Sequence, residues 1–323
     1  MNILVAGTGS IGKRHIKVLQ DILPACRLLF VRKFAREDHY SHSVNAEVFS
    51  TVEEALQHKV DLFVVSNPSA YHYEFVVKGI KYALPMYIEK PLVTKASHIA
   101  SIEEAVKKYS YSKPVQVGCN LRFMPSLIQM KAVLMSGRIG NVAHASFHAG
   151  QWLPDWRPGQ DFSRSYSASA VMGGGVIFDL IHEIDSARWM LGKLNPLCCY
   201  STSVESLNIK SESVAMSCLR SSSNVLVSIV LDYVSRKPLR RYQIIGDRGT
   251  LIWDLVQKQL LLQSSGQDEI LCYNPNDFDV DKTYYSAMRE LVCSIQQMSL
   301  PSQGLEDGLQ TAALAIDLKQ SNA

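Results

Sequence analysis

Lys90 is the side chain whose position best suits chemistry on an oxygen-bearing carbon. It lies in the motif Glu89-Lys90-Pro91, directly after the short apolar run 86–88, which predicts a buried strand. Desolvation in a closed crevice lowers the pKa of a lysine, and the charged form can polarise a substrate oxygen. We therefore predict a catalytic role for Lys90. The alternative is an ordinary surface lysine.

Asp179 and His182 form a second candidate, for proton transfer. They lie three residues apart in a stretch, 173–191, that reads as a glycine turn followed by a helix, so both are expected on one helical face. Imidazole titrates near neutrality and a neighbouring carboxylate can orient it, which suits proton transfer to or from a hydroxyl. The alternatives are a capping aspartate beside a core histidine and a metal-binding pair. No third ligand has a persuasive spacing, so we predict no metal.

The first nineteen residues predict the element that would hold a nucleotide cofactor. The run 3–6 reads as a buried strand and 13–19 as a helix. Between them, glycines permit a tight turn, a close approach of pyrophosphate and close packing of the helix on the strand. The helix N-terminus offers free N–H groups to phosphates. The predicted cofactor contacts of this turn are Gly7, Gly9, Ser10, Ile11 and Gly12. The alternative is a glycine-rich turn with a purely structural role.

The end of the second predicted strand, 28–31, indicates which dinucleotide is bound. In such a fold an acidic residue there accepts a hydrogen bond from the ribose 2′-hydroxyl of NAD, whereas a cation accommodates the 2′-phosphate of NADP. Arg32 and Lys33 occupy that point, and no carboxylate precedes Glu37. We therefore predict NADP, with NAD as the alternative. Arg32 and Lys33 could also be solvated surface charges.

Two further strand ends are predicted to face the same cofactor. The run 62–65 ends at Ser66 and Asn67, with His72 close behind, and the run 86–88 ends at Glu89. The carboxyl ends of strands in such a sheet face the cofactor crevice, so these four residues and Lys90 are predicted cofactor contacts. A helix-capping role explains Asn67 nearly as well.

Strands and helices alternate as far as the run 115–118, which predicts an α/β fold with a doubly wound parallel sheet. At 323 residues the chain is too long for one typical core. We place the domain boundary after residue 118. Residues 1–118 are predicted to form a Rossmann dinucleotide-binding domain, and 119–323 a substrate-binding and oligomerisation domain.

The second half contains a loop, 151–158, that is rich in aromatic and charged residues. Trp156 could stack on a sugar ring or pack as core, and Arg157 could bind an anionic group or pair with Asp155. Further on, 213–219 and 224–233 alternate like paired strands, and 240–253 reads as a hairpin around 246–249. The ranges 281–297 and 305–319 read as helices.

Composition excludes several classes of protein. A net charge of +3, without a dense run of Lys and Arg, argues against a nucleic-acid partner. No apolar run reaches membrane-spanning length, and Met1 leads directly into a strand, so we expect neither a membrane partner nor a signal peptide. The seven cysteines form no CxxC motif, which favours reduced thiols in a cytoplasmic protein.

Taken in order, four motifs resemble the glucose–fructose oxidoreductase / inositol dehydrogenase (Gfo/Idh/MocA) family: 7–12, 89–91, 120–123 and 173–185. The resemblance covers nearly the whole chain. It implies an N-terminal Rossmann domain and a C-terminal α/β domain with a large, mostly antiparallel sheet that often mediates dimers or tetramers. It also implies NAD(P)-dependent chemistry on hydroxyl and keto carbons of sugars, cyclitols and nucleotide sugars.

By position, the resemblance makes Lys90 the catalytic lysine and His182 the proton-transfer histidine. Many members have an acid four residues before that histidine, where this chain has Phe178; Asp179 would take its place or be structural. Arg122, in the third motif, is expected to contact substrate together with Trp156, Arg157, Asp179 and His182. The stretch 152–185 also resembles a branch associated with surface-polysaccharide sugars.

The resulting hypothesis is an NADP- or NAD-dependent oxidoreductase that acts on a sugar, cyclitol or nucleotide-sugar hydroxyl as a homodimer or homotetramer. Two other functions use the same scaffold: a dinucleotide-binding regulator without catalysis, and a reductase of a non-sugar carbonyl or imine. The presence of both Lys90 and His182 argues against the regulator.

Overall fold

A computed structural model describes residues 1–32, 37–156, 159 and 161–321. The chain divides into two compact units. Unit 1 contains Met1–Gly118 and Tyr284–Ala312, and unit 2 contains Cys119–Thr283 and the chain from Ala313. The break after residue 118 lies at the expected position, but the second domain is not the contiguous stretch 119–323 that the sequence suggests.

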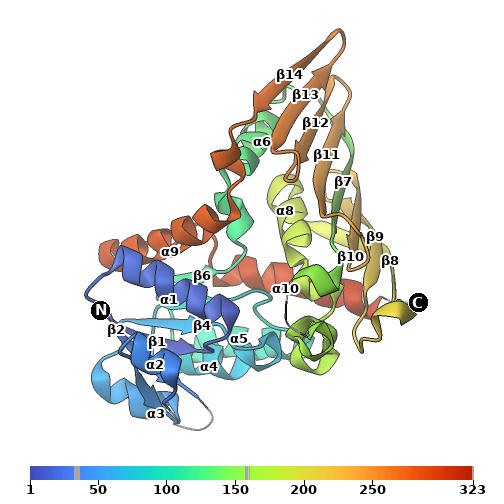
Figure 1. The fold of residues 1–323 in the computed structure, drawn as a ribbon. Helices are drawn as coiled ribbons and strands as arrows, with labels where there is room; N and C mark the ends of the chain where they lie inside the picture. The colour runs from blue at the N-terminus through green and yellow to red at the C-terminus, as the bar shows by residue number, and fades with distance from the viewer. Residues whose placement is uncertain (33–36, 157–158, 160, 322–323) are drawn as a thin grey trace. The chain divides into compact units, whose positions relative to one another are not determined.

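Unit 1 is built on a six-stranded sheet of parallel strands in the order β3-β2-β1-β4-β5-β6 (Figure 1). The expected doubly wound parallel sheet is therefore confirmed. The central strands are short apolar runs with almost no exposed surface, as sheets covered on both faces require. The strands are β1 (Asn2–Ala6), β2 (Arg27–Val31), β3 (Glu47–Phe49), β4 (Leu62–Val65), β5 (Met86–Ile88) and β6 (Val115–Val117).

Helices cover both faces of this sheet. Helix α1 lies on one face, and α4 and α5 lie on the other (Figure 1). The helices of the first 118 residues are α1 (Ser10–Ile22), α2 (His39–Ser43), α3 (Val52–Ala55), α4 (His72–Lys81) and α5 (Ala96–Lys108). Two more helices, α9 (Val280–Gln297) and α10 (Leu305–Gln320), each have residues in both units.

The segment between α9 and α10 covers the edge of the sheet at β6. The backbone N–H of Val117 donates a hydrogen bond to the carbonyl oxygen of Gln303 at 3.1 Å. In α10, Gly308 lies so close that a Cβ there would be 2.5 Å from a methyl group of Val117. These contacts are the physical reason why 284–312 belongs to unit 1: they satisfy and shield an otherwise open strand edge.

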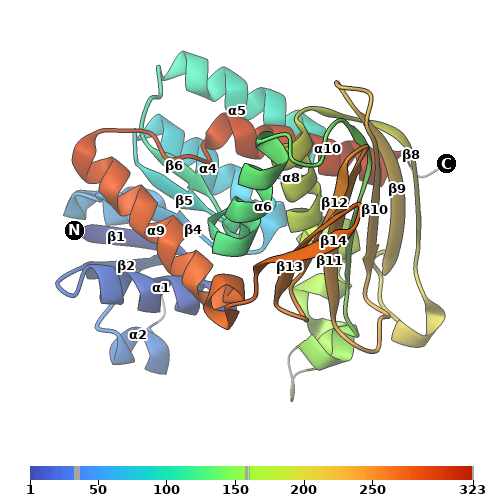
Figure 2. The same cartoon turned by 90° about the horizontal axis from the view of Figure 1, so that it is seen from above.

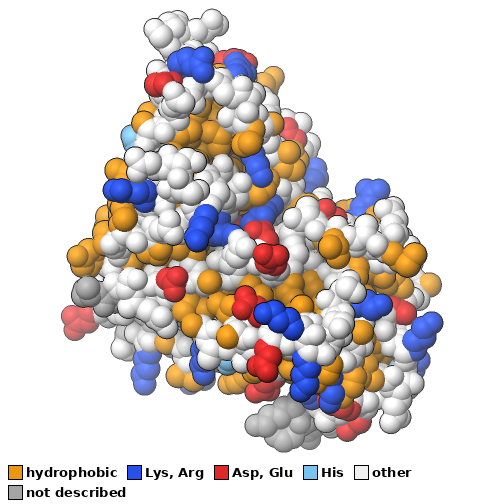
Figure 3. All heavy atoms as spheres, turned by 180° about the vertical axis from the view of Figure 1, so that it is seen from behind, with side chains coloured by type: hydrophobic (Ala, Val, Ile, Leu, Met, Phe, Trp, Pro, Cys, Tyr) orange, Lys and Arg blue, Asp and Glu red, His pale blue; other side chains and the backbone are white. Residues whose placement is uncertain are grey.

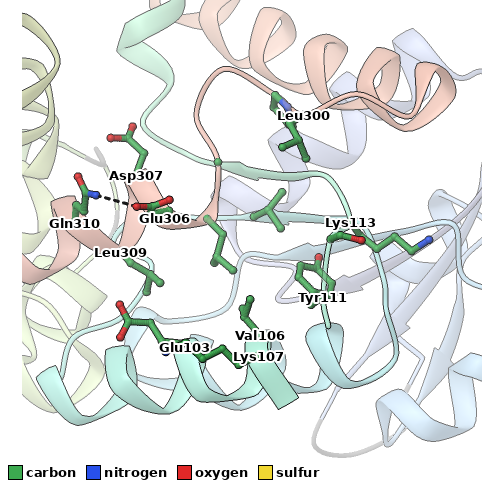
Figure 4. Close-up of a pocket in the computed structure, with 15 residues that line it drawn as sticks. Glu103, Val106, Lys107, Tyr111, Lys113, Leu300, Glu306, Asp307, Leu309 and Gln310 are labelled. Carbon is green, nitrogen blue, oxygen red and sulfur yellow. Dashed lines mark hydrogen bonds between the residues drawn. The ribbon is translucent and has the colours of Figure 1, made fainter. Parts of the chain in front are cut away.

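A pocket of 850 Å³ opens beside this edge (Figure 4). It lies between the C-terminal half of α5 and the start of α10, and its lining includes Glu103, Tyr111 and Glu306. None of the predicted site residues lines it.

Unit 2 contains an eight-stranded sheet in the order β14-β13-β12-β11-β7-β10-β9-β8. Neighbouring strands are antiparallel except β7 and β10, so the expected mostly antiparallel sheet is confirmed. The predicted hairpin is present as β11 and β12. The strands are β7 (Val142–Gly150), β8 (Leu194–Thr202), β9 (Val214–Ser221), β10 (Leu226–Asp232), β11 (Leu239–Gly246), β12 (Gly249–Asp254), β13 (Gln259–Ser264) and β14 (Gln267–Cys272).

The helices α6 (Pro125–Met135) and α8 (Ile181–Leu191) pack on one face of this sheet (Figure 2), and α7 (Val176–Asp179) contacts β9 and β10. The fully buried Glu183 fastens α8 to β11 through an ion pair with the Nε of Arg240 at 2.8 Å and a hydrogen bond from the hydroxyl of Tyr242 at 3.0 Å. On the α6 side, the indole N–H of Trp253 donates to Ser126 at 2.9 Å. Polar bonds as well as apolar packing thus hold the helices on the sheet.

Two further observations concern the surface. Within the described part of the chain, no helix is both long enough and apolar enough to span a bilayer. On the face shown in Figure 3, basic and acidic side chains of the described residues are interspersed.

Candidate functional site

The glycine turn after β1 has the shape that the sequence predicts. Gly7 has a φ of +99°, and a Cβ there would lie 2.3 Å from the backbone nitrogen of Asn67. A Cβ on Gly12 would lie 2.1 Å from the carbonyl oxygen of Gly7, so α1 could not pack this closely with any larger residue. Beside Gly9, in contrast, no atom lies within 4 Å of the Cβ position. The turn is closed toward the protein and open at Gly9.

The open side of the turn leads to the N-terminus of α1. Gly9 caps the helix without a side-chain hydrogen bond, and the first turn, which contains Ser10 and Ile11, has no acidic residue. The first N–H groups of the helix therefore have neither an intrahelical acceptor nor a side-chain cap among the described residues. Such a terminus attracts an anion.

The end of β4 supports this turn. The hydroxyl of Ser66 donates to the carbonyl oxygen of Gly7 at 2.8 Å, so Ser66 holds the turn in place. The side-chain oxygen of Asn67 is buried and accepts no hydrogen bond from any described residue. Such an acceptor fits a ligand that carries an N–H or O–H group. The closed turn, the free helix terminus and this acceptor together fit a dinucleotide.

His72 links the end of β4 to the lysine motif. Its ring nitrogens lie 2.7 Å from the carbonyl oxygen of Asn67 and 2.9 Å from that of Pro91. Burial lowers the pKa of His72, although both carbonyl oxygens oppose this effect. His72 is 1% exposed and connects the end of β4 to the segment that follows β5, and its predicted contact with the cofactor stays a prediction.

Arg32 has a carboxylate partner that the sequence analysis missed. Its guanidinium lies 3.0 Å from Asp38 and donates to the hydroxyl of Thr8 at 3.2 Å. Asp38 also caps α2 through the backbone N–H of Ser41. The Ser41 N–H and the nearby guanidinium hold the pKa of Asp38 at about 2. The signal that could have found Asp38 is the capping pattern Asp38-x-x-Ser41. Lys33 lies outside the described residues.

Lys90 is half-buried at the end of β5, next to the buried carboxylate of Glu89. Burial alone would raise the pKa of Glu89. A contact with His15 and the charge of Lys90 outweigh burial and hold that pKa below its ordinary value. Glu89 is therefore ionised at neutral pH, and its carboxylate contacts His15 and the backbone N–H of Lys90.

In unit 2, Asp179 is buried and accepts a hydrogen bond from the hydroxyl of Tyr233 at 2.7 Å. The ring of Trp156 meets the ring of Tyr233 edge to face, with centroids 5.2 Å apart. Burial, reinforced by the charge of Asp179, raises the pKa of Tyr233 well above its usual value, so the tyrosine is a permanent donor. Sequence reasoning missed Tyr233 because it reads simply as the end of an alternating strand.

Asp179 and His182 do not lie on one continuous helix, which the expectation of a shared helical face assumed. Asp179 ends α7, and Leu180, with φ −96° and ψ 35°, interrupts the helix before α8 begins at Ile181. The interruption removes the regular spacing on which the prediction rested. Both side chains are nevertheless 8% exposed.

Arg122 forms a bidentate ion pair with Asp185. Its Nε and Nη2 donate to the two carboxylate oxygens at 2.8 and 2.7 Å. Asp185 is buried, so this contact fastens the segment 120–123 to α8. The substrate role expected of Arg122 stays a prediction. Arg157 lies outside the described residues.

The site residues therefore fall into two groups. Unit 1 brings the glycine turn together with Ser66 and Asn67, and connects Asn67 through His72 to the lysine motif. Unit 2 brings Asp179 and Trp156 together through Tyr233. Among the described residues, no group of three or more His, Cys, Asp or Glu side chains could hold a metal ion.

Comparison with known families identifies both halves of the chain. Residues 1–118 match the model described as "Oxidoreductase family, NAD-binding Rossmann fold". Residues 127–252 match the Gfo/Idh/MocA C-terminal domain. Together the two matches cover most of the 323 residues.

Curated relatives include inositol 2-dehydrogenases. Inositol 2-dehydrogenase 2 of Saccharopolyspora erythraea is 32% identical over 202 residues, which cover 60% of this chain and 54% of the relative. Inositol 2-dehydrogenase of Gluconacetobacter diazotrophicus is 29% identical over 198 residues, 59% of this chain and 54% of the relative. The matched region thus spans about half the length of these relatives.

Solved structures share the fold over nearly the whole chain. A levoglucosan dehydrogenase in complex with NADH and L-sorbose has a TM-score of 0.82 at 16% identity, with 99% of this chain and 96% of that chain covered. GenD2 from gentamicin A biosynthesis, in complex with NAD, has a TM-score of 0.81 at 20% identity, with 99% and 93% covered. Because residues 1–118 match the NAD-binding domain of the family and residues 127–252 match its C-terminal domain, the chain belongs to the Gfo/Idh/MocA oxidoreductase family.

Proposed function

We propose that this protein is an NAD(P)-dependent dehydrogenase that acts on a hydroxyl or keto carbon of a sugar, cyclitol or nucleotide sugar. The observation that carries the proposal is the glycine turn, closed at Gly7 and Gly12 and open at Gly9, in front of a helix terminus without a side-chain cap. Membership of the family and the names of the matched relatives support the substrate class.

When bound, the nicotinamide supplies a hydride donor or acceptor at its ring. The chain supplies the other groups. The ammonium of Lys90 stabilises the negative charge that develops on the substrate oxygen, and His182 takes up or returns the hydroxyl proton. Asp179, held by Tyr233, contributes a carboxylate of fixed orientation for substrate or for His182. Arg122, Trp156 and Arg157 are assigned to substrate binding.

For the cofactor we propose a preference for NADP over NAD. The cations Arg32 and Lys33 follow β2, where a 2′-phosphate would lie. The ion pair between Arg32 and Asp38 opposes this preference, because a 2′-phosphate must compete with that carboxylate for the guanidinium. The matched structures named with NADH and NAD make NAD the alternative.

A titration of the purified protein with NADPH and with NADH, followed by nicotinamide fluorescence, tests the proposal. We expect NADPH to bind about tenfold tighter, which is about 1.4 kcal/mol. Arg32→Ala should remove the difference, whereas Asp38→Asn should tighten NADPH binding several-fold by freeing Arg32. Tighter binding of NADH would overturn the NADP assignment alone. Binding of neither nucleotide would overturn the dehydrogenase proposal.

The remaining assignments are proposals of the same kind. A panel of polyols, sugars and nucleotide sugars tests the substrate class, and the resemblance of 152–185 favours sugars of surface polysaccharides. We assign the protein to the cytoplasm because its seven cysteines are free thiols. We propose a homodimer or homotetramer formed through the sheet of unit 2.

A further inference from the structure

The fully buried side chain of His15 contacts the residue before Lys90. His15 lies on α1, and its Nε2 is 2.6 Å from Oε1 of Glu89, 74 residues further along the chain. Since α1 begins at the glycine turn and Glu89 follows β5, the pair joins the phosphate-binding end of unit 1 to the lysine motif.

The second oxygen of Glu89 accepts a hydrogen bond from the backbone N–H of Lys90 at 3.1 Å. The carboxylate therefore bridges the imidazole of His15 and the backbone from which the Lys90 side chain extends. A carboxylate whose two oxygens both make hydrogen bonds has a defined orientation. Because one oxygen of Glu89 accepts from the backbone N–H of Lys90, the orientation of this carboxylate constrains the Lys90 backbone.

The surroundings leave the pair little freedom. The ring of His15 packs against Tyr87, with centroids 4.5 Å apart, and meets the ring of Tyr284 edge to face, with centroids 5.8 Å apart. On the other side, the position of a Cβ on Gly118 is 3.1 Å from the carboxylate of Glu89, so a larger residue there would displace it.

The hydrogen bonding indicates which ring nitrogen of His15 carries a proton. Nδ1 of His15 is buried and makes no hydrogen bond with any described residue. A buried N–H without an acceptor is costly, so the proton belongs on Nε2, where it is donated to Glu89. Nε2 of His15 is thus the donor to the buried carboxylate of Glu89.

We propose that His15 is a positioning residue for Lys90. By donating to Glu89 it orients the carboxylate that holds the Lys90 backbone, and so sets where the lysine ammonium lies. The catalytic consequence rests on the proposed function, whereas the positioning itself does not.

The test measures how fast acetic anhydride labels Lys90, relative to the exposed Lys81, by peptide mass spectrometry of the whole protein. His15→Phe keeps the ring packing and removes the donor; His15→Gln keeps a donor. The matched control is His98→Phe, because His98 also stacks on a tyrosine, Tyr73, with centroids 4.1 Å apart.

We expect His15→Phe to change the labelling rate of Lys90 at least threefold and to leave that of Lys81 unchanged. His15→Gln should return Lys90 to within twofold of wild type, and His98→Phe should match wild type. With a substrate from the panel, kcat should fall about tenfold in His15→Phe with a smaller change in KM. Folded His15→Phe protein with wild-type labelling of Lys90 would overturn the proposal.

If His15→Phe does not fold, Glu89→Gln provides the second comparison. In this variant, loss of the carboxylate should change the rate at which Lys90 is labelled. Labelling of Lys90 at the wild-type rate would overturn the proposal. Labelling requires neither cofactor nor substrate. Failure of the wild-type protein to bind NADPH or NADH would therefore refute the proposed function and leave the labelling result to stand by itself.

Discussion

Glu89 carries a charge inside unit 1, so the stability of the fold should depend on pH through this residue. Contacts with His15 and Lys90 hold its pKa below its ordinary value despite burial. A carboxyl group whose pKa is lower in the folded state stabilises the fold above its unfolded pKa. That contribution is lost as the pH falls through the folded-state pKa.

We therefore expect Glu89→Gln to lower the free energy of unfolding by roughly 1–3 kcal/mol at pH 7. The difference from wild type should shrink as the pH falls below about 4.5, the ordinary pKa of a glutamate. Urea denaturation of both proteins between pH 3 and 7 measures it. A difference that stays constant over this range would show that the charge of Glu89 is not stabilising.

Lys90 offers the clearest separation of binding from chemistry. Lys90→Met keeps the length of the side chain and removes the ammonium. NADPH or NADH affinity should stay within about threefold, while kcat falls by about 10²-fold or more, as for loss of a group that stabilises negative charge in the transition state. Lys81→Met is the control on the same unit. Unchanged kcat in Lys90→Met would remove the lysine from the mechanism.

The residue types themselves were predictable, but their partners were not. Glycine spacing predicted the turn, because neither Gly7 nor Gly12 has room for a side chain. Asp38 beside Arg32, and Asp185 beside Arg122, depend on how the chain folds back on itself. A cation in the sequence predicts a charge, and only its neighbours decide whether that charge is available to a ligand.

At the scale of elements, the end of β10 and the end of α7 meet through Tyr233 and Asp179. Because Tyr233 is fully buried and its pKa is raised well above 10, its only role toward Asp179 at neutral pH is donation. The contact ties a strand of the unit 2 sheet to the helix that covers it.

Tyr233→Phe should therefore lower the free energy of unfolding by about 1–3 kcal/mol, because the buried carboxylate of Asp179 loses the hydrogen bond from the Tyr233 hydroxyl. Thermal denaturation measures this, with the exposed Tyr200→Phe as the matched control. If Asp179 also serves the reaction, kcat should fall in Tyr233→Phe and be unchanged in Tyr200→Phe. Equal stability of the two variants would show that the hydrogen bond contributes nothing.

Periodicity predicted most strands and helices within a few residues, including the hairpin of β11 and β12. It failed at Leu180, where one residue leaves the helical conformation between α7 and α8. Apolar spacing continues across such a break because both helices pack on the same sheet. The spacing of apolar residues indicates which side chains are buried, and side chains can be buried at this spacing without a continuous helix.

At the scale of the whole molecule, the sheet of unit 2 has an apolar patch on the face opposite its helices. Met216 on β9 pairs with Tyr200 on β8, and both are more than half exposed. On the adjacent strand β10, the half-buried Val230 pairs with Met216. Apolar patches of this kind mark surfaces that associate with another protein.

If a second copy covers this face, Met216→Asp should convert the protein to monomers, because a charge would be buried in the interface. Light scattering coupled to size-exclusion chromatography measures the mass, and Lys107→Asp, on the exposed side of α5, is the control. A wild-type protein that is monomeric at micromolar concentration would contradict the proposed oligomer.

The sequence by itself determined the parallel sheet of unit 1, the glycine turn, the break after residue 118 and the mostly antiparallel character of unit 2. These features follow from local spacing, and from a family resemblance that rests on short motifs. Only the tertiary structure decided that 284–312 returns to unit 1, that Tyr233 holds Asp179, and that His15 holds Glu89. Those contacts join residues 54 and 74 positions apart, and a polar pair at such separations leaves no periodic trace in the chain. Only folding brings these partners together. A carboxylate that becomes buried needs a hydrogen-bond donor, and that donor can come from any part of the chain.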